Sequence, residues 1–197
     1  GSDGAKRTIV SINQIPMDLQ DAFIALEDKT FREHKGFNII RIFGTIKDAI
    51  IHGNGISGTS TITQQLARNL YLEDKMGERS LKRKITEAYY AVILERRLNK
   101  DEILEAYLNT INFGQCYGIQ AASQTYFSKD VKDITIAEAA ALAAIPQYPQ
   151  GYKLVTTCNK SEVDDNTKNL IKISGDTAYL WNDAGKDRML TCLYLMH

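Results

Sequence analysis

Two glutamates, Glu27 and Glu87, lie in polar blocks of this 197-residue chain whose residue types could do chemistry. Glu27 opens a block at 27–36, and Glu87 closes a block in which it follows Arg83 and Lys84. A carboxylate can take the proton from an attacking hydroxyl group, and clustered cations can stabilise a leaving anion. The two blocks therefore suit a transfer reaction in which a hydroxyl attacks and an anion departs.

Two further blocks complete the set. Block 58–65, Gly-Thr-Ser-Thr-Ile-Thr-Gln-Gln, offers hydroxyls and amides at the start of an expected helix, where such groups can bind diphosphate or sugar oxygens. Block 100–109, Lys-Asp-Glu-Ile-Leu-Glu-Ala-Tyr-Leu-Asn, predicts a helix that supports the other blocks. The 24 basic and 24 acidic side chains cancel, so any anion site must be local and no nucleic-acid partner is expected.

Each block also has a plain structural interpretation. Glu27 could be a surface carboxylate that pairs with Arg32 or Lys35, and Arg83 and Glu87 could be an ordinary ion pair four residues apart on a helix. The Ser-Thr-Gln block could be a helix cap followed by two exposed glutamines. The basic residues of the third block could belong to a solvated helix face. Taken one at a time, the blocks leave these alternatives open.

In their order and spacing, the four blocks resemble the signature of the peptidoglycan glycosyltransferases, glycosyltransferase family 51. These are the polymerase domains of penicillin-binding proteins and their monofunctional relatives. The first block fits Glu-Asp-x-x-Phe-x-x-His-x-Gly at every fixed position, and the resemblance covers about residues 15–152. The chain departs from the family's usual pattern at Thr59, at Gln115-Cys116 and at Arg68, where a lysine is usual. The resemblance implies a mainly α, lysozyme-like fold of two lobes with a central cleft.

The resemblance assigns the chemistry to the two glutamates. It implies that Glu27 is the general base that activates the 4-hydroxyl group of the acceptor sugar. It implies that Glu87 is the second essential carboxylate, which either holds a divalent cation, Mg²⁺ or Mn²⁺, on the diphosphate or orients Arg83. No organic cofactor is implied. The implied substrate-site residues are Asp28, Phe31, His34, Ser60, Thr61, Thr63, Gln64, Gln65, Arg68, Arg83 and Lys84.

The fourth block has a supporting role in this interpretation. Its implied structural residues are Lys100, Glu105, Tyr107 and Asn109. Tyr107 and Asn109 are expected to hydrogen-bond the second block. In the first block, Asp28 is equally suited to a helix cap or an ion pair.

The reaction implied by the resemblance is the polymerisation of lipid II. A lipid-linked glycan strand is the donor, and the product is a β-1,4 bond formed with inversion and release of undecaprenyl diphosphate. The resemblance also implies inhibition by moenomycin and action at the outer face of the bacterial cytoplasmic membrane. The rival interpretations are a lysozyme-like lytic enzyme and an inactive helical binding domain. The basic block argues against lysis, because cleavage leaves no diphosphate to neutralise.

We predict one domain at 14–197 after an N-terminal arm at 1–13, whose Gly1-Ser2 we interpret as an expression scar. A soluble fragment without its membrane anchor is expected, since the sequence has no run of 18 or more apolar residues. The sequence has no Ser-x-x-Lys transpeptidase motif, and the helical end at Met196-His197 favours a further domain in the whole protein. Three cysteines are expected to be free thiols, and three histidines show no metal-ligand spacing.

Helices must position the four blocks. One helix is expected from Met17, with Glu27, Phe31 and His34 on one face and Gly36 at its end. A short amphipathic helix is expected at 38–52. Segment 37–57 is then either a core-facing helix or a mobile flap that contacts the membrane surface, and the resemblance favours the flap.

The remaining helices are expected at 60–72, 79–98, 100–109, 119–126, 136–145 and 185–197. Asn99 with Glu102 and Thr135 with Glu138 predict capping boxes. An apolar face is expected on the 79–98 helix, comprising Leu81, Ile85, Tyr89, Val92 and Leu98. Segment 158–187 is polar and glycine-bearing, and we expect looser structure there with one helix at most.

Overall fold

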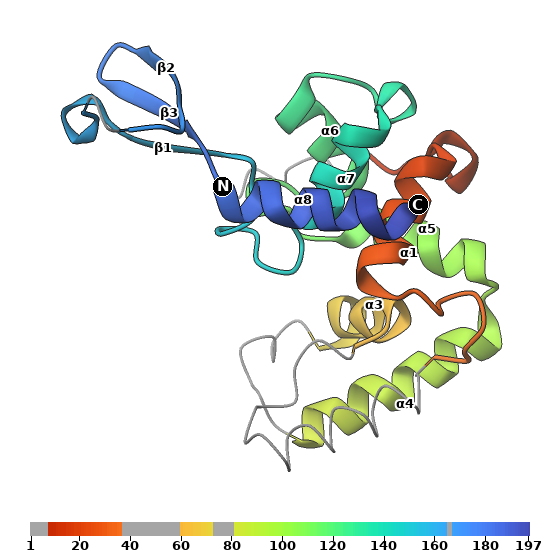
Figure 1. The fold of residues 1–197 in the computed structure, drawn as a ribbon. Helices are drawn as coiled ribbons and strands as arrows, with labels where there is room; N and C mark the ends of the chain where they lie inside the picture. The colour runs from red at the N-terminus through yellow and green to blue at the C-terminus, as the bar shows by residue number, and fades with distance from the viewer. Residues whose placement is uncertain (1–7, 37–59, 73–80, 165–166) are drawn as a thin grey trace, which may run out of the picture.

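Helices account for most of the structure, and the predicted mainly α class is confirmed (Figure 1). The computed structural model describes residues 8–36, 60–72, 81–164 and 167–197. The helix predicted at 38–52 and the flap predicted at 37–57 lie outside the described residues. Within the described part of the chain, no helix is both long and apolar enough to cross a membrane.

Helix α1, Met17–Glu27, carries the first glutamate at its last residue and contacts α7, Ile136–Ala144, and α8, Asp183–Met196. The alanine side chains of α7 from Ala139 to Ala144 are buried, and such small side chains let neighbouring helices come close. The predicted capping box of Thr135 and Glu138 starts α7. These three helices form one side of the candidate site.

Helix α3, Ile62–Tyr71, packs against α4, Leu81–Arg97, and against α5, Lys100–Thr110. The second, third and fourth blocks therefore meet along α3, below α1 in the view of Figure 1. The predicted capping box of Asn99 and Glu102 starts α5. The other helical elements are α6 at Ile119–Phe127 and short 3₁₀ helices at Ile12–Gln14, Val131–Asp133 and Lys160–Glu162.

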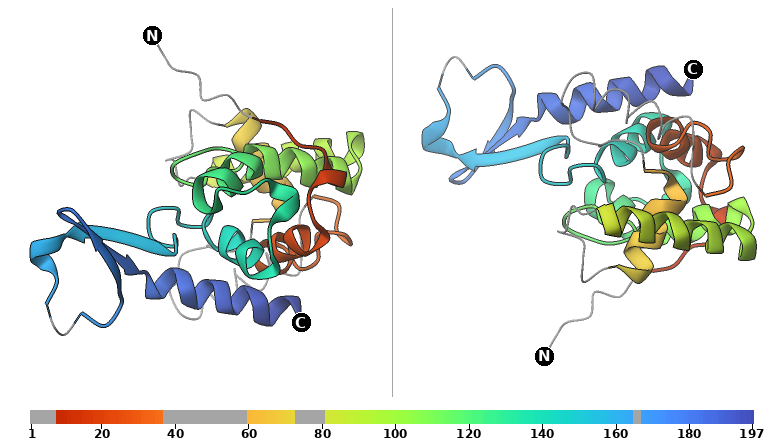
Figure 2. Two further views of the ribbon diagram at one scale, coloured as in Figure 1. Left: turned by 90° about the horizontal axis from the view of Figure 1, so that it is seen from above. Right: turned by 90° about the horizontal axis from the view of Figure 1, so that it is seen from below.

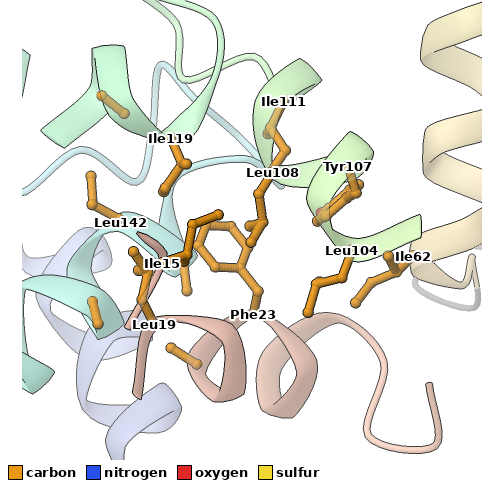
Figure 3. Close-up of a cluster of buried hydrophobic side chains, with 14 of the residues drawn as sticks. Ile15, Leu19, Phe23, Ile62, Leu104, Tyr107, Leu108, Ile111, Ile119 and Leu142 are labelled. Carbon is orange, nitrogen blue, oxygen red and sulfur yellow. The ribbon is translucent and has the colours of Figure 1, made fainter. Parts of the chain in front are cut away.

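A single apolar core joins the two groups of helices. Phe23 of α1 lies at its centre, surrounded by aliphatic and aromatic side chains from several other helices (Figure 3). Its ring meets those of Tyr107 and Phe113 edge to face, each with centroids 6.3 Å apart. Burial of each large apolar side chain stabilises the fold by about 1.5–3 kcal/mol, so the core holds α1 in place beside α5.

Helix α1 ends at Glu27, so its predicted continuation through Phe31 and His34 is wrong. Asp28 has φ −157° and ψ 74°, and the chain then proceeds in turns. The Asp28 carboxylate accepts a hydrogen bond from the backbone N–H of Ile62 at the start of α3, at 3.0 Å. A contact between distant segments holds Asp28 where local periodicity would have continued the helix.

The predicted apolar face of α4 is not its buried face, because Ile85 and Tyr89 are each 63% exposed. The buried side chains of the helix include those of Arg83, Glu87 and Ala91. Arg83 and Glu87 can be buried because they lie 3.5 Å apart as an ion pair, and Glu87 also pairs with Arg68 of α3. The apolar periodicity therefore identified the wrong side of α4.

Residues 155–181 form a three-stranded antiparallel sheet, which corrects the prediction of loose structure at 158–187. The strands β1, Val155–Asn159, β2, Leu170–Ser174, and β3, Thr177–Trp181, are ordered β1-β3-β2. The sheet projects from the helical body (Figure 2). A Gly-Asp pair forms the two-residue turn between β2 and β3, with Gly175 at φ +60°. The sequence analysis missed these strands because each is only five residues long and the polar residues between them dominate the composition of the segment.

Candidate active site

Glu27 faces a pocket of about 210 Å³ between α1, α3 and α8. Its Oε1 accepts a hydrogen bond from Nη2 of Arg188, and its Oε2 accepts one from Nε2 of Gln65, each at 3.0 Å. The alternative of a surface carboxylate is wrong, because the Glu27 side chain is 10% exposed and pairs with Arg188, while Arg32 lies 2.6 Å from Asp101. The pocket is lined by Leu26, Glu27, Ser60, Gln65, Arg68, Gln147 and Arg188.

Gln65 links Glu27 to the core of the domain. The hydroxyl of Tyr107 donates to Oε1 of Gln65 at 3.2 Å, as predicted for the contact between the fourth and second blocks. Since a carboxylate only accepts, Gln65 must direct its amide nitrogen at Glu27. Burial raises the pKa of Tyr107 well above its ordinary value, and the nearby Glu27 charge raises it further. Tyr107 therefore remains a protonated donor.

Glu87 is the centre of a charged cluster on the α3 side of the pocket. Its carboxylate is fully buried and lies 3.0 Å from Nε of Arg68, 3.5 Å from Nε of Arg83 and 3.0 Å from Nζ of Lys84. Lys84 also donates to the hydroxyl oxygen of Ser60 at 2.7 Å. Three cations around one carboxylate leave an excess of positive charge, which suits the local anion site expected in a chain with no net charge.

The surroundings of Glu87 bear on the two roles left open for it. Arg83, Arg68 and Lys84 occupy positions around the carboxylate and would repel a divalent cation. No cluster of three or more His, Cys, Asp or Glu suited to a metal is present among the described residues. These surroundings do not fit a resident metal at Glu87 and favour its role in orienting the cations.

The first block is tied to its surroundings through buried groups. Oδ2 of Asp28 accepts from Nε2 of His34 at 2.7 Å as well as from the backbone of Ile62. The ring of Phe31 is fully buried, and the Lys100 ammonium lies 4.6 Å from its centroid. Asp28, oriented by His34, thus holds the Glu27 end of α1 against the start of α3, whereas Phe31 contacts Lys100 of α5. The predicted contact of the three residues with substrate stays a prediction.

The side chains of Thr61, Thr63 and Gln64 in the second block are buried inside the protein. Thr61 caps α3 by accepting from the backbone of Gln64 at 3.1 Å, and its hydroxyl donates to the carbonyl of Gly36 at 2.8 Å. The hydroxyl of Thr63 donates to Glu95 at 2.6 Å. Their predicted contact with substrate stays a prediction. Of the second block, Ser60, Gln65 and the following Arg68 line the pocket.

The fourth block supports the site from behind. Lys100 donates to the carbonyl of His34 at 2.6 Å and to Glu95 at 2.7 Å. Oε2 of Glu105 accepts from the backbone of Ile12 at 2.7 Å. Asn109 exchanges hydrogen bonds with the backbone of Val10 instead of the predicted second block. Residues 8–13 of the predicted arm are thereby held against α5.

Arg188 and Gln147 line the pocket but belong to none of the four blocks. Arg188 is separated from Glu27 by 161 positions, so motif spacing could not connect them. One signal was available, because Arg188 shares a helical face with Gly185 and Cys192, which are both buried. A cation on the core-facing side of a helix indicates a buried partner.

Comparisons with known proteins identify the family of this chain. A family model described as transglycosylase matches residues 2–173. The chain is 42% identical over 175 residues to penicillin-binding protein 1F of Bacillus subtilis, covering 88% of this chain and 24% of that protein. It is 46% identical over 151 residues to penicillin-binding protein 1A of Escherichia coli, covering 76% of this chain and 17% of that protein. The chain thus spans a quarter or less of these relatives, and it belongs to the transglycosylase family.

Proposed function

We propose that this chain is a peptidoglycan glycosyltransferase domain that joins lipid-linked glycan to lipid II. The observation that carries the proposal is that one pocket holds a carboxylate, Glu27, and a cation of the Glu87 cluster, Arg68. Glu27 faces the pocket from α1, and Arg68 and Ser60 line it beside the buried Glu87. A glycosyl transfer that releases a diphosphate requires both groups, whereas a binding domain requires neither.

In the proposed reaction, the 4-hydroxyl group of lipid II approaches Glu27 and transfers its proton to the carboxylate. The hydroxyl oxygen forms the new β-1,4 bond at the anomeric carbon of the donor strand, with inversion. The bond from that carbon to the diphosphate breaks, and its electron pair leaves with undecaprenyl diphosphate. Arg68, Arg83 and Lys84 stabilise the departing anion, while Gln65 keeps Glu27 aimed at the hydroxyl.

A divalent cation, Mg²⁺ or Mn²⁺, fits this reaction as a group that arrives on the diphosphate. The cations around Glu87 leave the carboxylate without the open position that a resident metal needs. A metal on the substrate would share the diphosphate charge with Arg83 and Lys84. No organic cofactor has a place in the proposed reaction, since a base and an anion site suffice for it.

A lipid-linked substrate places the proposed activity at a membrane surface, on the outer face of the bacterial cytoplasmic membrane. Exposed apolar side chains where α3 ends beside α4 support this placement: Leu70 is 47% exposed, Tyr71 51%, and Ile85 and Tyr89 63% each. Tyr71 stacks on Tyr90 of α4 with ring centroids 4.7 Å apart, so these residues form one patch. Ile85→Ser with Tyr89→Ser should reduce flotation with anionic liposomes without lowering stability, and unchanged flotation would exclude this patch.

The rival activity is cleavage of glycan strands. It would use Glu27 in the same fold, but it would leave the buried cluster of Glu87 with Arg68, Arg83 and Lys84 without a purpose. Incubation with isolated glycan strands separates the two activities, because a lytic enzyme would release short fragments. An inactive binding domain would bind lipid II without converting it to polymer, so binding and turnover of lipid II measured on the same sample identify it.

The test of the proposed function is polymerisation of purified lipid II in detergent with Mg²⁺, followed on a gel. The wild-type chain should make polymer, and moenomycin should suppress it. Glu27→Gln keeps the shape of the side chain but removes the base, so its rate should fall on the order of 10²–10⁴-fold. Glu33→Gln is the matched control, because Glu33 is exposed in the same block. Equal rates for Glu27→Gln and wild type would reject Glu27 as the base.

A further inference from the structure

Arg188 of α8 is built into the wall of the pocket by three contacts. Its Nη2 lies 3.0 Å from Oε1 of Glu27, and its Nε donates to the carbonyl of Ala144 at 3.2 Å. The guanidinium also lies over the ring of Tyr152, 5.2 Å from its centroid. Its side chain is 18% exposed. An exposed, adventitious ion pair would have none of this enclosure, so the position of the guanidinium is fixed by the fold.

The three contacts suit an arginine and no other cation. The carbonyl of Ala144 belongs to the last turn of α7, where helix carbonyls lack partners within the helix. A planar guanidinium can donate from Nε to this carbonyl and from Nη2 to Glu27 at the same time, with one face on Tyr152. A lysine ammonium is a single point and would have to choose among these partners. Arg188 therefore ties α1 to the end of α7 through Glu27.

Glu27 is held from two sides. Gln65 of α3 donates to Oε2, and Arg188 of α8 donates to Oε1. Two donors on separate helices fix the plane of the carboxylate as well as its position. In a reaction that depends on the approach of a hydroxyl group, misplacement of the base by about 1 Å costs about 10²-fold in rate.

We propose that Arg188 is a positioning residue for Glu27, which orients the base through Oε1 from outside the four sequence blocks. This inference rests on the proposed function, since it assigns Arg188 a part in that reaction. Arg188 acts through Glu27, because its Nε and Nη2 are directed at protein groups and its ring-facing side is covered by Tyr152. It is therefore distinct from the cations around Glu87, of which Arg68 lines the pocket and is the one proposed to meet the diphosphate there.

The kinetic test compares Arg188→Ala, Arg188→Lys and the control Lys186→Ala, which removes an exposed cation from the same helix. For Arg188→Ala, kcat for lipid II should fall by about 10²-fold with KM within about twofold of wild type. Guanidinium at low concentration should restore part of the lost kcat, because it can occupy the vacated space. Arg188→Lys should retain more activity than Arg188→Ala, and Lys186→Ala should match wild type with and without guanidinium.

A rise in KM at unchanged kcat would overturn the proposal, because it would place Arg188 on the substrate. A loss of kcat without rescue by guanidinium or lysine, together with a lower Tm, would reduce Arg188 to a structural role. If the wild-type chain makes no polymer, the proposed function fails, and a double-mutant cycle in thermal stability tests the pairing itself. Arg188→Ala and Glu27→Gln should then be non-additive, and additive effects would overturn the pairing.

Discussion

Replacing Glu87 with glutamine should destabilise the domain, because its carboxylate is fully buried among three cations. Removing one partner of a buried ion pair costs about 3–5 kcal/mol, since a buried charge is left uncompensated. Arg68 and Lys84 are 25% and 34% exposed, so water can solvate them in the variant and the lower end of that range applies. A loss of about 3 kcal/mol lowers the Tm of a domain of this size by roughly 6–12 °C.

Thermal unfolding followed by circular dichroism, with urea unfolding alongside, measures this loss for Glu87→Gln. The exposed Glu33→Gln variant removes the same charge elsewhere and should melt like the wild-type protein. Inorganic pyrophosphate should raise the Tm of Glu87→Gln more than that of wild type, because its oxygens replace the lost negative charge among the cations. A Glu87→Gln variant as stable as wild type would refute the reasoning, since the cations would then not depend on Glu87.

The remaining predictions concern three other sites. Tyr107→Phe should lower kcat about tenfold and stability by about 1 kcal/mol, because Gln65 loses the hydrogen bond that Tyr107 donates. Turnover and urea unfolding measure the two effects, and an unchanged kcat would show that Tyr107 does not help to orient Glu27. Gly36→Ala should lower the free energy of unfolding by at least about 1 kcal/mol, since Gly36 has φ +97° and a Cβ would lie 3.0 Å from the Ala91 carbonyl carbon. Urea unfolding measures this loss, and a variant as stable as wild type would contradict the positive φ of Gly36. Burial raises the pKa of the Cys192 thiol to about 11 from 9.0. The thiol is neutral in the fold, so its contribution to stability is complete below pH 9 and lost as pH rises towards 11. Cys192→Ala should show a smaller fall in Tm across that window, and an identical fall would exclude this cause.

Local patterns predicted the helical framework well. The capping boxes at Asn99 and Thr135 appear as predicted, because a capping box needs only the side chains and backbone of one helical turn. The predicted contact between Tyr107 and the second block is also present. Such predictions succeed where the deciding interaction lies within a short stretch or within a pattern of fixed spacing.

Other predictions failed where a distant segment decided the outcome. Helix α1 was expected to continue past Glu27, but Asp28 instead binds the start of α3. Apolar periodicity placed Ile85 and Tyr89 on the buried side of α4, whereas the side with Arg83 and Glu87 is buried. A charged residue can be buried only beside a partner. Arg83 is a partner of Glu87 that the local spacing identifies, but Arg68 comes from α3, and the local sequence of α4 does not show it.

The sequence by itself determined which chemical groups are candidates for this site, namely the proposed base Glu27, and Glu87 with the basic residues near it, together with most of the helices that carry them. Only the tertiary structure decided which of these groups line the pocket, and that Arg188 from the last helix holds the base. The physical reason is that residue type and periodicity act over one or two turns. Burial and ion pairing, in contrast, are settled when separate segments pack together, as for Glu27 and Arg188, which are 161 positions apart.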